Sequence, residues 1–196
     1  MTVMQLKATV LKADRRRREH LAWETWMRTA AKMANSFYND AGEDDPFNYG
    51  ETASVGFLAT AAARAGYLAL PEFAVKKVSQ IDRRKRGRGR SDLWLMTESG
   101  QDWWFEFKQH FITRGSDRDL ERRWEAAIRC ADQIKMHGSA VAGLVASLAW
   151  LKQHRPSNLD AAQEALNRFQ DQRQFAYRIG ARNADPETYI FLEIVD

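Results

Sequence analysis

The chain lacks the features of a secreted or membrane-inserted protein. Cys130 is the single cysteine in 196 residues, so no internal disulfide can form and a disulfide-rich secreted scaffold is excluded. No apolar run approaches the roughly 18 residues of a membrane helix, and the longest, 139–151, predicts a buried strand. The N-terminal apolar stretch is interrupted by Lys7, and no small-residue cleavage site follows it, so we expect no signal peptide. These absences predict a soluble, cytoplasmic protein.

Zinc-site spacings of cysteine and histidine, internal repeats and low-complexity linkers are also missing from the sequence. What is present is apolar: 44% of the residues are hydrophobic, 11% are aromatic, and seven are tryptophan. That content is enough for a core and excludes general disorder. The length fits one domain, or one domain with an appended piece.

The hydrophobic pattern alternates between helical and strand periods. We expect an N-terminal strand or arm over 2–12, helices over 13–38, 50–65, 117–136 and 159–175, and strands over 68–80, 92–97, 103–109, 141–151 and 188–195. This order predicts an α/β fold, a central mixed sheet flanked by helices. We expect residues 1–49 to form a helical extension packed on a core of residues 50–196, and the nearly all-apolar strand from Val141 to be central.

Positive charge is concentrated in two runs, within a net charge of +4 that permits nucleic-acid binding without indicating it. We interpret Arg15–Arg18 as a solvated surface. The second run, RRKRGRGR at 83–90, we expect to be a loop leading into Asp92. Because glycine permits close backbone approach and arginine donates bidentate hydrogen bonds, we expect it to contact a nucleic-acid backbone. The residues expected to do so are Arg84, Lys85, Arg86, Arg88 and Arg90.

Charged residues interrupt the two strands of an expected hairpin, whose turn is Ser99-Gly100. Alternation puts Trp104, Glu106 and Lys108 on one face, opposite a face made of aromatic residues. Pairing with the preceding strand would bring Asp92 close to them. Two carboxylates form a hard-oxygen site suited to Mg²⁺ or Mn²⁺, and a lysine beside them can activate water or stabilise charge on phosphorus. The alternative is a Glu106–Lys108 ion pair on an exposed face.

These strands, SDLWLM at 91–96 and WWFEFKQ at 103–109, resemble the second and third core strands of the PD-(D/E)xK nuclease superfamily. Asp92, Glu106 and Lys108 fall on the three motif positions. The resemblance covers about residues 50–150. It implies a restriction-endonuclease-like core of order α-β-β-β-α-β, a Mg²⁺ or Mn²⁺ cofactor, and phosphodiester hydrolysis by inline water attack.

Glu51, at the start of the preceding helix, matches the position of a further acidic metal ligand in many members. An acidic residue in a first helical turn also suits the helix dipole, so metal binding and capping both remain open for Glu51. The sequence has Ser91 where the motif has proline, a position that varies in the family. Gln133 is not followed by a tyrosine four residues later, so the lambda-exonuclease-like pattern is not supported.

We therefore expect a Mg²⁺-dependent nuclease, acting on DNA rather than RNA, with Gln109 as an accessory residue that touches substrate or a metal-bound water, or else as a plain strand-end residue. The alternative is a nucleic-acid-binding module with weak or no catalysis, or a subunit of a defence, mobile-element or repair assembly. The long N-terminal helix carries two tryptophans and two methionines on its apolar side, which leaves open a homodimer or a protein partner at that helix.

Overall fold

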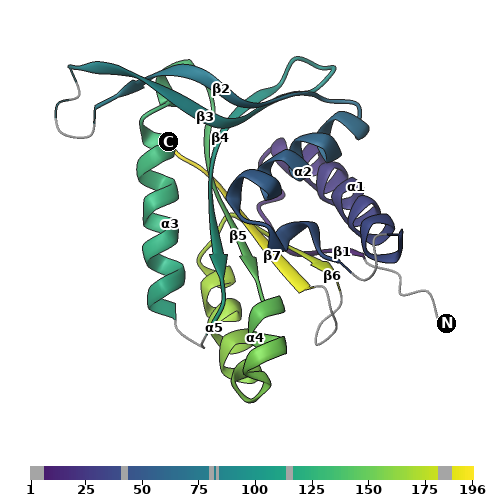
Figure 1. Cartoon of the computed structure of the whole chain (residues 1–196). Helices are drawn as coiled ribbons and strands as arrows, with labels where there is room; N and C mark the ends of the chain where they lie inside the picture. The colour runs from purple at the N-terminus through teal and green to yellow at the C-terminus, as the bar shows by residue number, and fades with distance from the viewer. Residues whose placement is uncertain (1–6, 41–43, 80–81, 83, 114–116, 181–186) are drawn as a thin grey trace.

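The computed structural model of the chain describes residues 7–40, 44–79, 82, 84–113, 117–180 and 187–196. It is an α/β structure with one seven-stranded mixed sheet flanked by helices (Figure 1). The helices are α1 (Glu19–Asp40), α2 (Glu51–Arg64), α3 (Asp117–Asp132), α4 (Ala149–His154) and α5 (Leu159–Asp171), with short 3₁₀ turns at Pro46–Asn48, Lys135–His137 and Pro156–Asn158. The strands are β1 (Ala8–Ala13), β2 (Leu68–Val78), β3 (Arg86–Met96), β4 (Asp102–Phe111), β5 (Ala140–Ser147), β6 (Phe175–Gly180) and β7 (Glu187–Ile194).

The strand order in space is β1-β6-β7-β5-β4-β3-β2. Strands β2, β3 and β4 form an antiparallel meander, and the turn between β3 and β4 contains Gly100 at φ 78, as the Ser99-Gly100 signal predicts. Helix α3 then connects β4 to β5, which pairs with it in parallel. A parallel pair requires such a crossover, because its second strand must start at the same end of the sheet. β4 and β5 therefore lie at the centre of the sheet.

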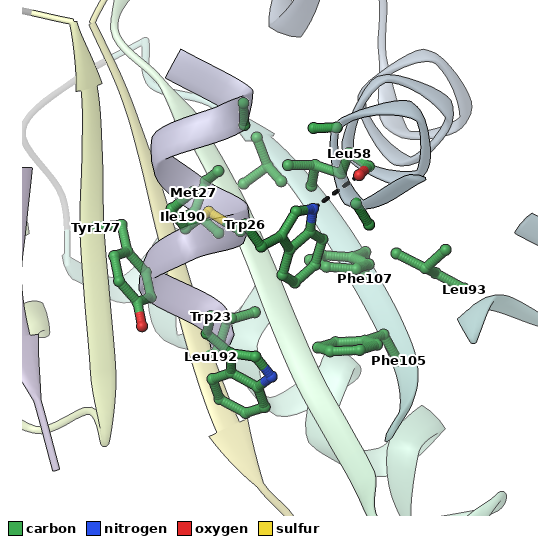
Figure 2. Close-up of a cluster of buried hydrophobic side chains, with 14 of the residues drawn as sticks. Trp23, Trp26, Met27, Leu58, Leu93, Phe105, Phe107, Tyr177, Ile190 and Leu192 are labelled. Carbon is green, nitrogen blue, oxygen red and sulfur yellow. Dashed lines mark hydrogen bonds between the residues drawn. The ribbon is translucent and has the colours of Figure 1, made fainter. Parts of the chain in front are cut away.

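Helices α1 and α2 cover one face of the sheet, and the tryptophans of α1 pack there with aromatic side chains of β4 and β6. Figure 2 shows Trp23 and Trp26 of α1 among the buried side chains of β4, β6 and β7. The indole Nε1 of Trp26 donates a hydrogen bond to the carbonyl of Leu58 on α2, at 2.8 Å. The apolar side of α1, at which the sequence leaves a homodimer or a protein partner possible, is thus covered by the sheet of the same chain.

Helices α3 and α5 cover the opposite face. The alternation along β5 divides its side chains between the two faces: Val141 and Val145 belong to the α1–α2 side, and Ala142 and Leu144 to the α3–α5 side. Every residue of β5 is buried, which confirms the prediction of a central strand. No helix in the described part of the chain is long and apolar enough to cross a membrane.

Several expected boundaries are wrong. The expected loop at 86–90 is the first half of β3. Residues 149–151 begin helix α4 instead of ending a strand, and the expected helix over 159–175 stops at Asp171. Phe175 begins β6, which was not predicted and pairs with both β1 and β7. Pairing with strands distant in sequence decides the conformation of this segment, and a local pattern does not contain that information.

Candidate functional site

Asp92 lies where backbone pairing between β3 and β4 stops. The ladder runs from Met96–Asp102 to Leu93–Phe105. Beyond it, the Asp92 carboxylate accepts a hydrogen bond from the backbone N–H of Phe107, with 2.7 Å between Oδ2 and N. Burial raises the pKa of Asp92 and Glu51 adds to that, while the Phe107 N–H and Lys108 oppose it. The contact fixes Asp92 against the strand that carries the other two motif residues.

Glu106 is almost fully buried, with 2% of its surface exposed. Its neighbours on β4, Phe105 and Phe107, belong to the aromatic core on the α1–α2 side, so Glu106 points to the other face, as strand alternation predicts. Burial, reinforced by the nearby negative charge of Asp92, raises the pKa of Glu106 from 4.5 to about 7. The alternative of an exposed ion pair between Glu106 and Lys108 is therefore excluded.

Lys77 of β2 is the cation beside Glu106. Its Nζ lies 2.7 Å from Oε1 of Glu106, and this ion pair opposes the rise in the pKa of Glu106. The aliphatic stem of Lys77 crosses Gly89 of β3, where an added Cβ would lie 2.7 Å from Cδ of the lysine. The sequence analysis missed Lys77 because nothing local distinguishes it from Lys76. The available signal was Gly89, the glycine of β3 that the lysine stem crosses.

Lys108 is paired with Glu51, not with Glu106. Its Nζ lies 2.9 Å from Oε1 of Glu51 and donates to the carbonyl of Phe107 at 2.6 Å. The other Glu51 oxygen accepts the backbone N–H of Gln109 at 3.1 Å. Burial alone would lower the pKa of Lys108, but Glu51 and Asp92 outweigh it and the pKa is raised. Lys108 therefore carries its positive charge at neutral pH.

A hollow of about 470 Å³ adjoins Glu51 and opens beside the end of β4. Gln109 lines it and is buried; its Nε2 donates to the carbonyl of Phe47 at 2.7 Å, while its Oε1 has no hydrogen-bond partner. Arg122 and Arg123 of α3 line the same hollow, within reach of a phosphate near Glu51. His110 of β4 also lines the hollow and is half-buried, and burial lowers its pKa.

Cys130 lies on α3, the helix that covers this face, and is half-buried. Burial raises the pKa of its thiol, and the charges of Lys108 and Glu106 act on it. The thiol is therefore protonated at neutral pH and adds no charge to the site.

The basic segment differs most from expectation. Arg86, Arg88 and Arg90 lie on β3 and are exposed, each two residues from the next and separated by glycines. Arg84 and Lys85 are exposed in the turn before the strand, and Arg83 lies outside the described residues. The segment does lead directly into Asp92, as expected, but as a continuous strand.

Of the three acidic residues, Asp92 acts on Glu106, and Glu51 has partners of its own. Asp92 and Glu106 interact electrostatically, whereas Glu51 is held by Lys108 and Gln109. Within the described ranges, no group of three or more His, Cys, Asp or Glu side chains is close enough to hold a metal ion. Two carboxylates nevertheless suit Mg²⁺, which keeps several waters and takes its remaining ligands from substrate phosphate. The burial of Glu106 and the charge of Asp92 near it favour a cation at this position, where Lys77 lies in the present structure.

Comparison of the chain with protein-family models, with curated proteins and with solved structures finds no match.

Proposed function

We propose that the chain is a divalent-metal-dependent nuclease that hydrolyses DNA, with Asp92, Glu106 and Lys108 as its catalytic residues. The observation that carries this proposal is that the buried carboxylate of Glu106, the half-buried carboxylate of Asp92 and the charged Lys108 lie together where the pairing of β3 with β4 stops. Such an arrangement is costly to stability unless the charges are compensated, because burial and the charge of Asp92 raise the pKa of Glu106.

The topology around the gap also supports the proposal. Helix α2, strands β2, β3 and β4, helix α3 and strand β5 follow one another in the order α-β-β-β-α-β, which is the order that the resemblance to PD-(D/E)xK nucleases implies. In that reading the restriction-endonuclease-like core spans residues 51–147, α1 packs against α2 of this core, and β1 pairs with β6 at the far edge of the sheet. Strands β6 and β7 with α4 and α5 extend the sheet on its other side.

Each residue has a separate role in the proposed reaction. Asp92 and Glu106 would hold Mg²⁺ or Mn²⁺, which when bound polarises the scissile phosphate and lowers the pKa of water. Lys108, charged at neutral pH, stabilises the negative charge that builds on phosphorus and cannot act as a base. Glu51 holds the lysine in place, and Arg122 and Arg123 position the flanking phosphate in the hollow beside it.

The second candidate is a nucleic-acid-binding module without turnover. The observation in its favour is that Lys77 and Lys108 already pair with Glu106 and Glu51, so two of the three carboxylates of the site have a cation beside them without a metal. In this reading the lysines and the exposed arginines of β3 bind the backbone, and hydrolysis does not follow.

Cleavage assays separate the two candidates. Supercoiled plasmid, single-stranded DNA and RNA are each incubated with the protein in Mg²⁺, Mn²⁺ or EDTA. We expect metal-dependent cutting of DNA that Asp92→Ala and Lys108→Ala both abolish. Glu98→Gln in the exposed β3–β4 turn and Lys32→Ala on the exposed side of α1 are the matched controls, and they should cut like the wild type. Binding without cutting in any metal supports the second candidate and contradicts the first.

A further inference from the structure

The outer halves of β2 and β3 form a two-stranded ribbon. Residues 74–78 pair with 86–90, and β4 pairs with β3 only from Leu93 onward, so no third strand supports this part. In Figure 1 the ribbon extends along the top of the molecule past α3. Its outer part is held against the rest of the molecule, because the carbonyl of Gln133 accepts the backbone N–H of Val78 at 3.0 Å and a ring nitrogen of His137 lies 2.8 Å from the carbonyl oxygen of Lys76. The ribbon is therefore a fixed projection of the sheet.

The two faces of the ribbon differ in character. Phe73, Val75 and Lys77 are partly buried on the inner face; Phe73 packs against Trp104, and Lys77 reaches Glu106. The outer face is exposed and carries four cations: Lys76, Arg86, Arg88 and Arg90. Arg90 has one distant acidic partner, Glu72 at 3.8 Å, and its side chain remains 71% exposed. The outer face thus offers a row of guanidinium groups to a polyanion.

We propose that this ribbon lies in the major groove of B-form duplex DNA while the gap between β3 and β4 engages one strand. The inference rests on the proposed function for its choice of nucleic acid. Two strands about 4.8 Å apart, with their side chains, match the roughly 12 Å width of the major groove, which admits a two-stranded ribbon. The arginines then donate to phosphates along the groove and to base edges within it.

The composition of the ribbon argues against single strands and RNA. Proteins that bind single strands stack bases on aromatic side chains, and the outer face described above has none; the nearby aromatic ring, Phe73, is turned inward onto Trp104. An RNA duplex has a deep and narrow major groove that a ribbon does not enter. Duplex DNA is the nucleic acid that fits both the width and the charge of this surface.

The position of the ribbon relative to the site sets the length of the contact. Arg90 is two residues before Asp92 and Arg86 is six residues before it on the same strand. At about 3.3 Å per residue the arginines reach about 20 Å from Asp92. That length corresponds to about six base pairs of duplex at 3.4 Å each. The bound DNA therefore extends at least this far on one side of the position facing Asp92.

Binding measured in EDTA tests the inference without cleavage. The protein is titrated with a fluorescent 24-base-pair DNA duplex, the corresponding single strand and the corresponding RNA duplex, over a range of KCl concentrations. The triple variant Arg86→Gln, Arg88→Gln, Arg90→Gln should bind the DNA duplex at least tenfold more weakly and lower the slope of log affinity against log salt by about 2 to 3. The control variant Arg15→Gln, Arg16→Gln, Arg18→Gln removes three exposed arginines elsewhere and should bind like the wild type.

The groove is tested with a duplex whose pyrimidines carry bulky C5 substituents, because C5 faces the major groove. We expect at least tenfold weaker binding to it, and no effect of a ligand that fills the minor groove. An unchanged affinity for the blocked duplex, an unchanged affinity of the ribbon variant, or an equal loss on all three nucleic acids would overturn the inference. Each of these results leaves metal-dependent cleavage to be scored separately, so the ribbon inference and the nuclease proposal can fail independently.

Discussion

Lys77 on the edge strand β2 reaches across β3 to Glu106 on β4, with 2.7 Å between Nζ and Oε1. The crossing is possible because Gly89 of β3 has no side chain at the point where the lysine stem passes. A cation therefore lies against the carboxylate with the highest proton affinity of the candidate site. The glycine of the basic segment serves the site on its inner face, while the neighbouring arginines occupy the outer face.

Removing this cation should destabilise the protein in a pH-dependent way. Lys77→Met leaves Glu106 without a neighbouring ammonium group, so the pKa of Glu106 rises further. At pH 8 we expect a loss of about 1–3 kcal/mol in the free energy of unfolding, because a buried charged group is left without compensation. At pH 5 Glu106 holds a proton and the loss should be smaller. Urea unfolding at both pH values measures it, with Lys76→Met, whose side chain is exposed on the same strand, as the control; equal losses at the two pH values would contradict the expectation.

Glu106 itself should make stability fall as pH rises. Its pKa is about 7 in the folded protein against 4.5 ordinarily. Between those values the folded state binds more protons than the unfolded state, so the stability that the proton contributes is lost as pH rises through the folded pKa. Glu106→Gln removes this dependence and should gain about 3 kcal/mol relative to the wild type between pH 4 and pH 8. Unfolding curves over this range, with Glu98→Gln as the exposed control, decide it; parallel pH profiles of the Glu106 variant and the wild type would show that the carboxyl is not perturbed.

The two open roles of Glu51 predict different kinetics. If Glu51 positions Lys108, as its 2.9 Å contact with Nζ indicates, Glu51→Gln keeps a hydrogen-bond acceptor but removes the charge that raises the pKa of Lys108. The alkaline limb of the pH–rate profile should then move to lower pH, with the Mg²⁺ concentration for half-maximal activity little changed. If Glu51 binds metal, that Mg²⁺ concentration should rise at least tenfold while the alkaline limb stays in place. Glu24→Gln, on helix α1 and therefore on the face of the sheet opposite to Glu106, serves as the control for loss of one carboxylate.

The sequence predicted the faces of β4 correctly because a strand alternates with a period of two, and a slip by one residue would turn Glu106 and Lys108 into the aromatic core in place of Phe105 and Phe107. It also placed the β3–β4 turn and the central strand β5. The partners of the charges were not predictable in this way. Lys77 and Glu106 are 29 positions apart and meet only because β2, β3 and β4 twist together, and Glu51 meets Lys108 only through the docking of α2 on the sheet.

The prediction of a loop for the basic segment was wrong for a related reason. Glycine and arginine are poor strand formers, so 86–90 predicted a loop. In the structure Gly89 lies opposite Val75 in the ladder, and a side chain at this position would obstruct the stem of Lys77. Glycine inside a strand often marks such a close approach. The strand thus depends on a contact with β2 that local propensity does not report.

Gly143 on β5 should be as important to the candidate site as the charged residues. It pairs directly with Phe107 of β4, and a Cβ at this position would lie 2.3 Å from Cδ1 of the phenylalanine. Phe107 is fully buried and stacked on Phe105, so its ring has little room to move, and its backbone N–H and C=O hold Asp92 and Lys108. Gly143→Ala should therefore cost about 1–3 kcal/mol in stability, as overpacking of a core does. It should also lower the cleavage rate by more than tenfold at temperatures where the protein remains folded, because the motif strand shifts.

The double variant Gly143→Ala, Phe107→Leu separates crowding from other effects of the alanine. A smaller side chain at 107 leaves space for the new Cβ, so the double variant should be more stable than the sum of the two single changes predicts, by about 1 kcal/mol or more. Ala142→Gly, which alters the adjacent residue on the opposite face of β5, should show no such coupling with Phe107→Leu. Thermal and urea unfolding of the variants measure the coupling. Simple additivity would contradict the contact between position 143 of β5 and the ring of Phe107 on β4. The positions of Lys108 and Asp92 would then depend on something other than the packing of these two strands.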